Sequence, residues 1–170
     1  MRAALFLWRK KLGIRRPYLH FNPTLVAARM KTEVRNAFGK VIMTVEHEAA
    51  NYLVNNNWMG YQTREGIITA ANVSLEVIAR HHYPHLLNDN TLVLGPWDHA
   101  VEWIAQDWTP RAIAAGLTHF AHIVSPESFA APSAEAMAGS TAGRFQMRIF
   151  GNVPEARAWL RAARTDRAKA

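Results

Sequence analysis

The sequence predicts an α/β fold with a mixed central sheet of about five strands flanked by helices. Three observations predict this class. The chain has 170 residues, of which 49% are hydrophobic and 19% charged, which suits one domain with a substantial core. Strand-like and helix-like periods alternate from about residue 40. No internal repeat and no linker divides the chain.

Two strands are expected first. Residues 41–45 are typical of a strand, and residues 52–58 are typical of its antiparallel partner. The asparagine run at 55–57 is poor strand material. Tyr52, Val54 and Trp58 nonetheless share one face by the two-residue period of a strand.

An amphipathic helix is expected next, from an N-cap at Thr63 to about His82, where Pro84 ends it. Residues 85–87 then indicate a short buried strand, and the polar residues 88–90 follow its end. The apolar side of the helix is formed by Ile67, Ile68, Ala71, Leu75, Ile78 and Ala79.

A second helix is expected after Gly95-Pro96, because a proline in the first turn costs little. Trp103 lies at the border of its apolar side. Thr109-Pro110 is expected to cap and restart a further turn, and Gly116 to end it. The apolar side is formed by Trp97, Val101, Ile104, Ala105 and Trp108.

The rest of the chain continues the alternation. Residues 117–124 are almost continuously apolar, as in a strand covered on both faces. Residues 125–143 are rich in Ser, Ala, Gly and Pro and predict a loop with a short helix around 133–138. A loop of this length is expected to be either a functional flap over one end of the sheet or disordered. A last strand over 144–150 and a final helix capped by Asn152 complete the domain.

The net charge of +7 is concentrated at the two ends of the chain. Residues 1–38 carry +8, residues 39–160 carry −4 and residues 161–170 carry +3. A nucleic-acid-binding domain carries its basic patch on the folded surface. We therefore expect no nucleic-acid partner.

The chain is divided into a basic extension over residues 1–37, an α/β domain over 38–163 and a polar tail over 164–170. The extension is expected either to be disordered or to precede a native start at Met30. A transmembrane helix needs about 20 apolar residues, and no such run is present. The sequence has no cysteine, which fits a reducing compartment, and we expect a cytoplasmic location.

Six short motifs carry a family resemblance. They are Trp58-x-Gly60, Leu86-Leu87-x-Asp89, Trp103 with Trp108-x-Pro110, Gly116-Leu117-x-x-x-Ala121, Arg148-x-Phe150 and Ala156-x-x-Trp159-Leu160. In order and spacing they resemble the SpoIIAA-like group, also described as STAS/SEC14 domain-containing proteins. The resemblance covers about residues 38–162.

The resemblance implies a STAS-like sheet flanked by helices and a non-enzymatic regulatory role through protein contacts. Related domains are sometimes switched by phosphorylation at a helix start after the third strand. Thr91 is the nearest hydroxyl here, and the Asp-Ser-Ser-Gly-like motif of the anti-sigma-factor antagonists is absent. The SEC14 part of the family name implies an apolar ligand.

Asp89, Trp97 and Trp103 are the candidate ligand-binding residues, because open α/β sheets bind ligands beyond the carboxyl ends of their strands. Trp103 is the tryptophan that helical spacing leaves at a rim. Asp98 and Glu102 are explained as acids that the helix dipole favours near a helix start.

Neither a metal site nor a cofactor is expected. The string His81-His82-x-x-His85 straddles a helix end, so its three rings should diverge. No Ser-His-Asp motif or phosphate loop is visible, and no catalytic residue is assigned. A protein partner is favoured, a small apolar ligand is the alternative, an enzyme using Asp89 with a histidine is the least favoured, and homodimerisation is left open.

Overall fold

The structure is a computed structural model that describes residues 31–167. The expectations for residues 1–30, including the native start at Met30, lie outside the described residues, as do residues 168–170. In chain order the elements are β1 (Lys31–Arg35), β2 (Val41–Glu48), η3 (Ala49–Asn51), β3 (Leu53–Gly60), α2 (Arg64–His81), β4 (His85–Val93), η4 (Asp98–Ala100), α3 (Val101–Trp103), η5 (Ile104–Trp108), α4 (Thr109–Ala114), β5 (His119–Ile123), α5 (Ala131–Thr141), β6 (Gln146–Phe150) and α6 (Val153–Arg167). Within the described range, no helix is both long enough and apolar enough to cross a membrane.

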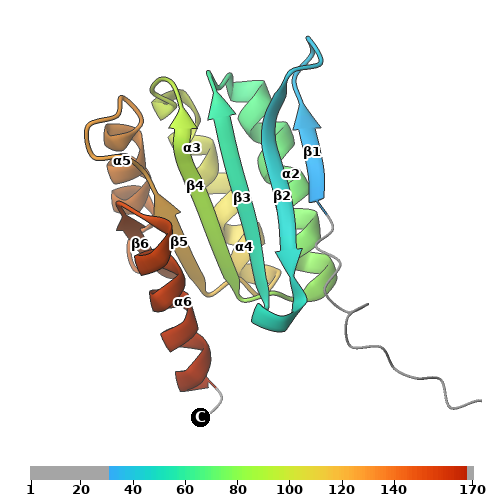
Figure 1. The fold of residues 1–170 in the computed structure, drawn as a ribbon, viewed down its shortest axis with the longest axis vertical. Coiled ribbons are helices and arrows are strands. Elements are labelled where there is room, and N and C mark those ends of the chain that lie inside the picture. The colour runs from blue at the N-terminus through green and yellow to red at the C-terminus, as the bar shows by residue number, and fades with distance from the viewer. Residues whose placement is uncertain (1–30, 168–170) are drawn as a thin grey trace, which may run out of the picture.

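The six strands form one mixed sheet in the order in which they occur in the chain (Figure 1). Strands β1 to β3 pair antiparallel, and β3 to β6 pair parallel. Each parallel strand is added beside its predecessor, so right-handed crossovers place α2, α3–α4 and α5 on one face. Helix α6 follows the last strand and covers the other face, in front of the sheet in Figure 1. The predicted α/β class is confirmed, with six strands in place of about five.

Strand β1 belongs to the sheet although the sequence assigns it to the basic extension over residues 1–37. It pairs antiparallel with β2, with Lys31 opposite Glu46. Only Val34 of its five residues is buried. Exposed charged residues are typical of an edge strand, where they hinder pairing with other chains. The sheet therefore begins before the predicted domain boundary at residue 38.

Helix α2 has the predicted N-cap and ends close to the predicted position. The Thr63 hydroxyl accepts a hydrogen bond from the Gly66 N–H at 3.1 Å, which satisfies one of the free donors of the first turn. His82 adopts the left-handed conformation at φ 52° and ends the helix, and its N–H donates to the Ile78 carbonyl. The helix thus ends before Pro84, as predicted.

The second helical segment differs from the prediction at Thr109-Pro110. The chain continues from α3 through the π-helical turn η5 into α4 without a break. Pro110 has no N–H to donate to the preceding turn, and a widened π turn accommodates this defect. Thr109 is therefore fully buried inside the helix and caps nothing. Gly116, at φ 106°, follows the helix end as predicted.

The segment 125–143 is more ordered than the predicted flap. Helix α5 spans eleven residues, almost twice the predicted length. Its side chains Ala131, Ala134 and Met137 pack into the large core. Small residues hid this helix from the sequence prediction, because alanine packs closely without marking a strongly apolar side.

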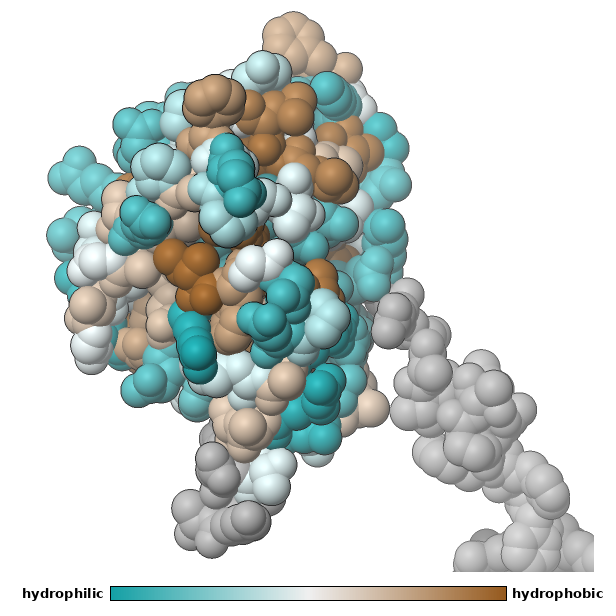
Figure 2. Space-filling view, turned by 60° about the vertical axis from the view of Figure 1, so that its left-hand side comes forward, coloured by the Kyte–Doolittle hydropathy of each residue, from teal (hydrophilic) through white to brown (hydrophobic). Residues whose placement is uncertain are grey.

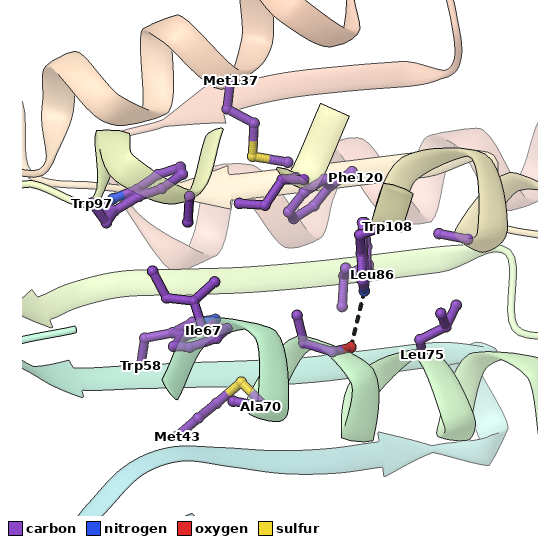
Figure 3. Close-up of a cluster of buried hydrophobic side chains, with 14 of the residues drawn as sticks. Met43, Trp58, Ile67, Ala70, Leu75, Leu86, Trp97, Trp108, Phe120 and Met137 are labelled. Atoms are coloured by element: carbon purple, nitrogen blue, oxygen red, sulfur yellow. Dashed lines mark hydrogen bonds between the residues drawn. The ribbon is translucent and has the colours of Figure 1, made fainter. Parts of the chain in front are cut away.

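Two apolar clusters lie on opposite faces of the sheet. The larger one lies under α2, α3–α4 and α5 and contains Trp58, Trp97, Trp108 and Phe120 (Figure 3). The smaller one lies under α6. Alternate residues of the same strands supply the two clusters, because successive side chains of a strand point to opposite faces. The smaller cluster consists of Leu53, Leu87, Ala121, Ile123, Phe150, Ala156 and Leu160.

The surface in Figure 2 is largely polar, with apolar residues gathered toward its upper part. This is the end of the molecule at which the β3 and β4 arrowheads lie in Figure 1. Leu92 and Leu94, at the end of β4, and Phe129, between β5 and α5, are exposed. All three lie at the carboxyl edge of the parallel strands, Leu92 within β4 and the other two in the connections that follow β4 and β5.

Candidate functional site

A row of polar side chains crosses the middle of the sheet on the face covered by three helical segments. Asn56 of β3, Asn88 of β4 and His122 of β5 are register partners. Their exposed fractions are only 2%, 7% and 1%. Neighbouring strands lie about 4.8 Å apart, so the row spans roughly 10 Å. A buried polar row within an apolar core needs hydrogen-bond partners.

The hydrogen bonds of the row fix the orientation of its two amides. An indole can only donate, and the Trp58 indole donates to Asn88 Oδ1 at 2.7 Å. Asn88 Nδ2 therefore faces away and donates to Asn90 Oδ1 at 2.9 Å. Asn56 Nδ2 donates to Ser74 Oγ at 2.9 Å and lies 3.4 Å from Asn88 Oδ1. Asn56 Oδ1 is left without a partner.

His122 ends the row and has no hydrogen-bond partner at either ring nitrogen. Burial lowers the pKa of His122 to about 4, so the imidazole is neutral near neutral pH. A neutral imidazole offers one donor and one acceptor. Its ring stacks against Trp97, with ring centroids 5.7 Å apart. The Trp97 indole N–H is also unpartnered, whereas the Trp97 backbone N–H donates to Ser133 Oγ at 3.0 Å.

These side chains line a cavity between the sheet and the helices. The empty space between its walls, including its opening, is about 500 Å³. The part of this space that the centre of a water molecule can reach is about 50 Å³. Because one bound water needs about 10–15 Å³ of such space, the cavity holds several waters or a small organic group. Figure 3 shows Phe120 between Trp97 and Trp108 in the apolar cluster. The apolar walls include Trp58, Ile67, Trp97, Trp108, Phe120 and Met137.

The wall at Trp108 is held by a hydrogen bond. Its indole N–H donates to the Ala71 carbonyl at 2.9 Å, the dashed line in Figure 3. Trp108 ends the π-helical turn η5, whose first residue Ile104 also lines the cavity. Such turns recur at functional sites. Here the turn forms part of the cavity wall.

The cavity gathers most of the unsatisfied buried polar atoms of the described side chains. Eight such atoms occur, and five of them belong to residues that line the cavity. Leaving a buried polar group without a partner costs about 1–3 kcal/mol. Such groups gathered at one cavity indicate a site for a polar ligand edge or for ordered water. The residues are Asn56, Gln62, Trp97 and His122, with two atoms from His122.

A bulge in β4 shapes the same edge of the cavity. Asn57 pairs with Asp89 and Met59 pairs with Leu92, so the single residue Trp58 of β3 lies opposite two residues of β4, Asn90 and Thr91. Bulges often re-aim side chains beside functional sites. This bulge lets Asn90 line the cavity, while the exposed Thr91 is the extra residue.

Asp89 and Thr91 form the hydrogen bonds of this bulge. Asp89 Oδ1 accepts from the Thr91 N–H at 2.9 Å and from the Thr91 hydroxyl at 2.7 Å. Asp89 lies on the α6 side of β4, opposite the cavity, because it alternates with Asn88. Thr91 lies within the strand and not at a helix start.

Among the predicted ligand-binding residues, only Trp97 lines the cavity. Asp89 is on the other face of the sheet. Trp103 is half-buried and packs against the large cluster without lining the cavity. Asp98 and Glu102 are exposed at the start of the second helical segment. The structure therefore does not bring Asp89, Trp97 and Trp103 together.

The histidine string diverges as predicted. His81 stacks against His47 at 4.6 Å, His82 is exposed, and His85 is buried in β4 beside His119. Among residues 31–167, no three His, Cys, Asp or Glu side chains are grouped so that they could hold a metal ion.

Sequence reasoning missed the polar row. Its three members each lie two positions after an inward-facing apolar residue, and this two-residue period was the available signal. Polar residues at inward positions of a buried strand are unusual and indicate a special role. The pairs are Val54 with Asn56, Leu86 with Asn88, and Phe120 with His122.

No protein-family model, no curated protein and no solved structure was found to match this chain. The SpoIIAA-like resemblance therefore stays a prediction, and the function must be argued from the cavity.

Proposed function

We propose that this protein binds a small, mostly apolar organic molecule in the cavity between the sheet and α2, α3–α4 and α5. The observation that supports this proposal most directly is that four residues lining one apolar cavity have buried polar atoms without hydrogen-bond partners. These residues are Asn56, Gln62, Trp97 and His122. Apolar walls supply affinity, and a few convergent polar groups fix the orientation of a ligand.

The position of the cavity supports this proposal. Gln62, Asn90 and Trp97 line it near the carboxyl ends of β3 and β4. Open α/β sheets bind their ligands at this edge. A bound molecule that supplies hydrogen bonds to the polar row would offset the cost of burying it.

A cytoplasmic regulatory role of the SpoIIAA-like kind, with a STAS-like fold, is the second candidate. The exposed Leu92, Leu94 and Phe129 at the carboxyl edge favour it, because apolar side chains there can meet a partner protein. Ligand binding and partner binding are compatible, since the cavity lies near the same edge.

Native mass spectrometry of the protein isolated gently from its own cells tests ligand binding. We expect a retained small molecule on the wild type and on His85→Phe, in which a buried histidine of the opposite face is changed. His122→Phe should lose it. If the wild type retains no molecule and a small-molecule extract of the cells leaves its thermal stability unchanged, the proposal fails, because a bound ligand stabilises the native state.

A further inference from the structure

The unpartnered atoms of the cavity-lining residues restrict the ligand that can fill the cavity. Asn56 Oδ1 and Gln62 Oε1 are acceptors and need donors from the ligand. The Trp97 indole N–H is a donor and needs an acceptor. His122 presents one of each. A hydrocarbon would leave all of these groups unsatisfied, and a ketone or ether would leave the two amide oxygens unsatisfied.

The orientation of Asn56 is the most constrained of these features. Its Nδ2 is used by Ser74 and Asn88, and Asn88 is in turn fixed by the donor-only indole of Trp58. Rotating the Asn56 amide would keep a hydrogen bond to the Ser74 hydroxyl, which can also donate, but would place Asn56 Oδ1 against Asn88 Oδ1, two acceptors about 3.4 Å apart. The observed orientation therefore favours a ligand that brings an N–H or O–H to Asn56.

Charge further restricts the ligand. None of the side chains that line the cavity is a carboxylate, an ammonium or a guanidinium. A charged group buried there would have no counter-ion, and burying an unpaired charge is very costly. Trp58, Trp108 and Phe120 instead form walls that suit a flat ring.

We infer that the ligand is an uncharged planar ring compound with a lactam-type edge, in which an adjacent N–H and C=O meet the polar row. The N–H donates to Asn56 Oδ1, and the C=O faces the His122 end of the row, where a bridging water connects it to the imidazole or to the Trp97 indole N–H, because the row is too long for one lactam edge to span. This inference rests on the proposed function and narrows it to one chemical class.

Three bicyclic probes of similar size separate the features of this class. Carbostyril, the lactam of quinoline, is uncharged and has both N–H and C=O. Naphthalene has neither, and quinaldate carries a carboxylate. By titration calorimetry or tryptophan fluorescence, we expect carbostyril to bind at least about tenfold more tightly than naphthalene, the factor that one net hydrogen bond supplies. Quinaldate should not bind measurably. Equal binding of naphthalene, or tighter binding of quinaldate, overturns the inference.

N-methylcarbostyril tests the donor to Asn56, because it keeps the ring and carbonyl but has no N–H. We expect a loss of about tenfold for the wild type and for Asn57→Leu, the same substitution at the next residue on the opposite face. Asn56→Leu should bind the two lactams equally. An undiminished preference for carbostyril in Asn56→Leu overturns the assignment of Asn56.

Failure of this inference is distinguishable from failure of the proposed function. If a molecule is retained from the cells but no lactam binds, the cavity binds another class of ligand, and only the lactam inference is overturned. If no molecule is retained from the cells, and ordered waters alone form hydrogen bonds to Asn56 and His122 in the presence of carbostyril, the lactam inference and the proposed function both fail.

Discussion

The two faces of the sheet use the same strands in opposite ways. On the α6 face, Leu87, Ala121 and Ile123 pack against apolar side chains of the helix. On the other face, the polar row of Asn56, Asn88 and His122 occupies equally buried positions. Apolar burial stabilises the fold, whereas unpartnered polar groups destabilise it. The α6 face therefore only stabilises the fold, whereas the other face combines the larger apolar cluster with the unpartnered polar groups on which the proposed binding role rests.

The contrast extends to charge. Beside the α6 cluster, Glu48 accepts two hydrogen bonds from Arg157, at 2.7 and 3.1 Å, and a third from Asn51 at 2.8 Å. The hydrogen bond to Glu48 raises the pKa of Arg157. This largely buried carboxylate is paired, whereas five neutral polar atoms of the cavity-lining residues have no hydrogen-bond partner. The cavity therefore differs from the α6 face because some of its buried polar atoms lack hydrogen-bond partners, and not only because it is polar.

Leu87→Ala should have the largest effect. It removes a buried leucine from the α6 cluster, and such a change costs about 2–5 kcal/mol. Urea unfolding measures this loss. Carbostyril affinity of the folded variant should equal that of the wild type, because the cavity is on the other face. A parallel loss of affinity in folded protein would contradict the separation of the two faces.

Acid should destabilise the fold through His122. The folded protein holds the pKa of His122 at about 4, below its ordinary value of 6.5, because burial disfavours the charged ring. Between these values the unfolded chain binds more protons, so stability falls as the pH falls from 6.5 to 4. The loss amounts to about 3 kcal/mol.

Urea unfolding across this pH range measures the contribution of His122. His122→Phe should remove this part of the pH dependence, and His85→Phe should retain it. An unchanged pH dependence in His122→Phe would show that the ring does not remain neutral in the folded protein.

At neutral pH, His122→Phe should raise the free energy of unfolding by about 1 kcal/mol, because it removes two buried nitrogens without partners. Carbostyril affinity should fall at least about tenfold. Urea unfolding and calorimetry on the same samples give both values. Strong destabilisation, as for Leu87→Ala, would mean that His122 is an ordinary core residue.

Thr91→Ala should have the smallest effect, about 0.5–1 kcal/mol, because the two bonds to Asp89 lie at an exposed position. Only the hydroxyl bond is lost, and Thr91→Ser should keep it. Thermal unfolding compares the two variants. Equal destabilisation by both would assign the effect to the β propensity of threonine and not to the bulge.

Local signals predicted much of the fold. Thr63 and His82 bound α2 through cap chemistry that acts within a few residues. The prediction failed where packing overrode local preference. Pro110 suggested a break, but the buried Thr109 and the π turn keep the helix continuous. Strand β1 was missed because an edge strand with one buried residue has no clear alternation.

The site was harder to predict because it depends on register. The two-residue period can place Asn56, Asn88 and His122 inward on their own strands. It cannot show that three separate strands align them in one row. Trp97 was predicted from its position after a strand and does line the cavity. Asp89 followed the same rule, but alternation turned it to the opposite face.

A crystal structure of protein purified rapidly and without added ligand tests the central claim most directly. We predict continuous density for a flat organic molecule between Trp97 and Trp108, with polar atoms within hydrogen-bond distance of Asn56 Oδ1 and His122. A cavity that is collapsed, or filled only by waters that satisfy these groups, would contradict the account.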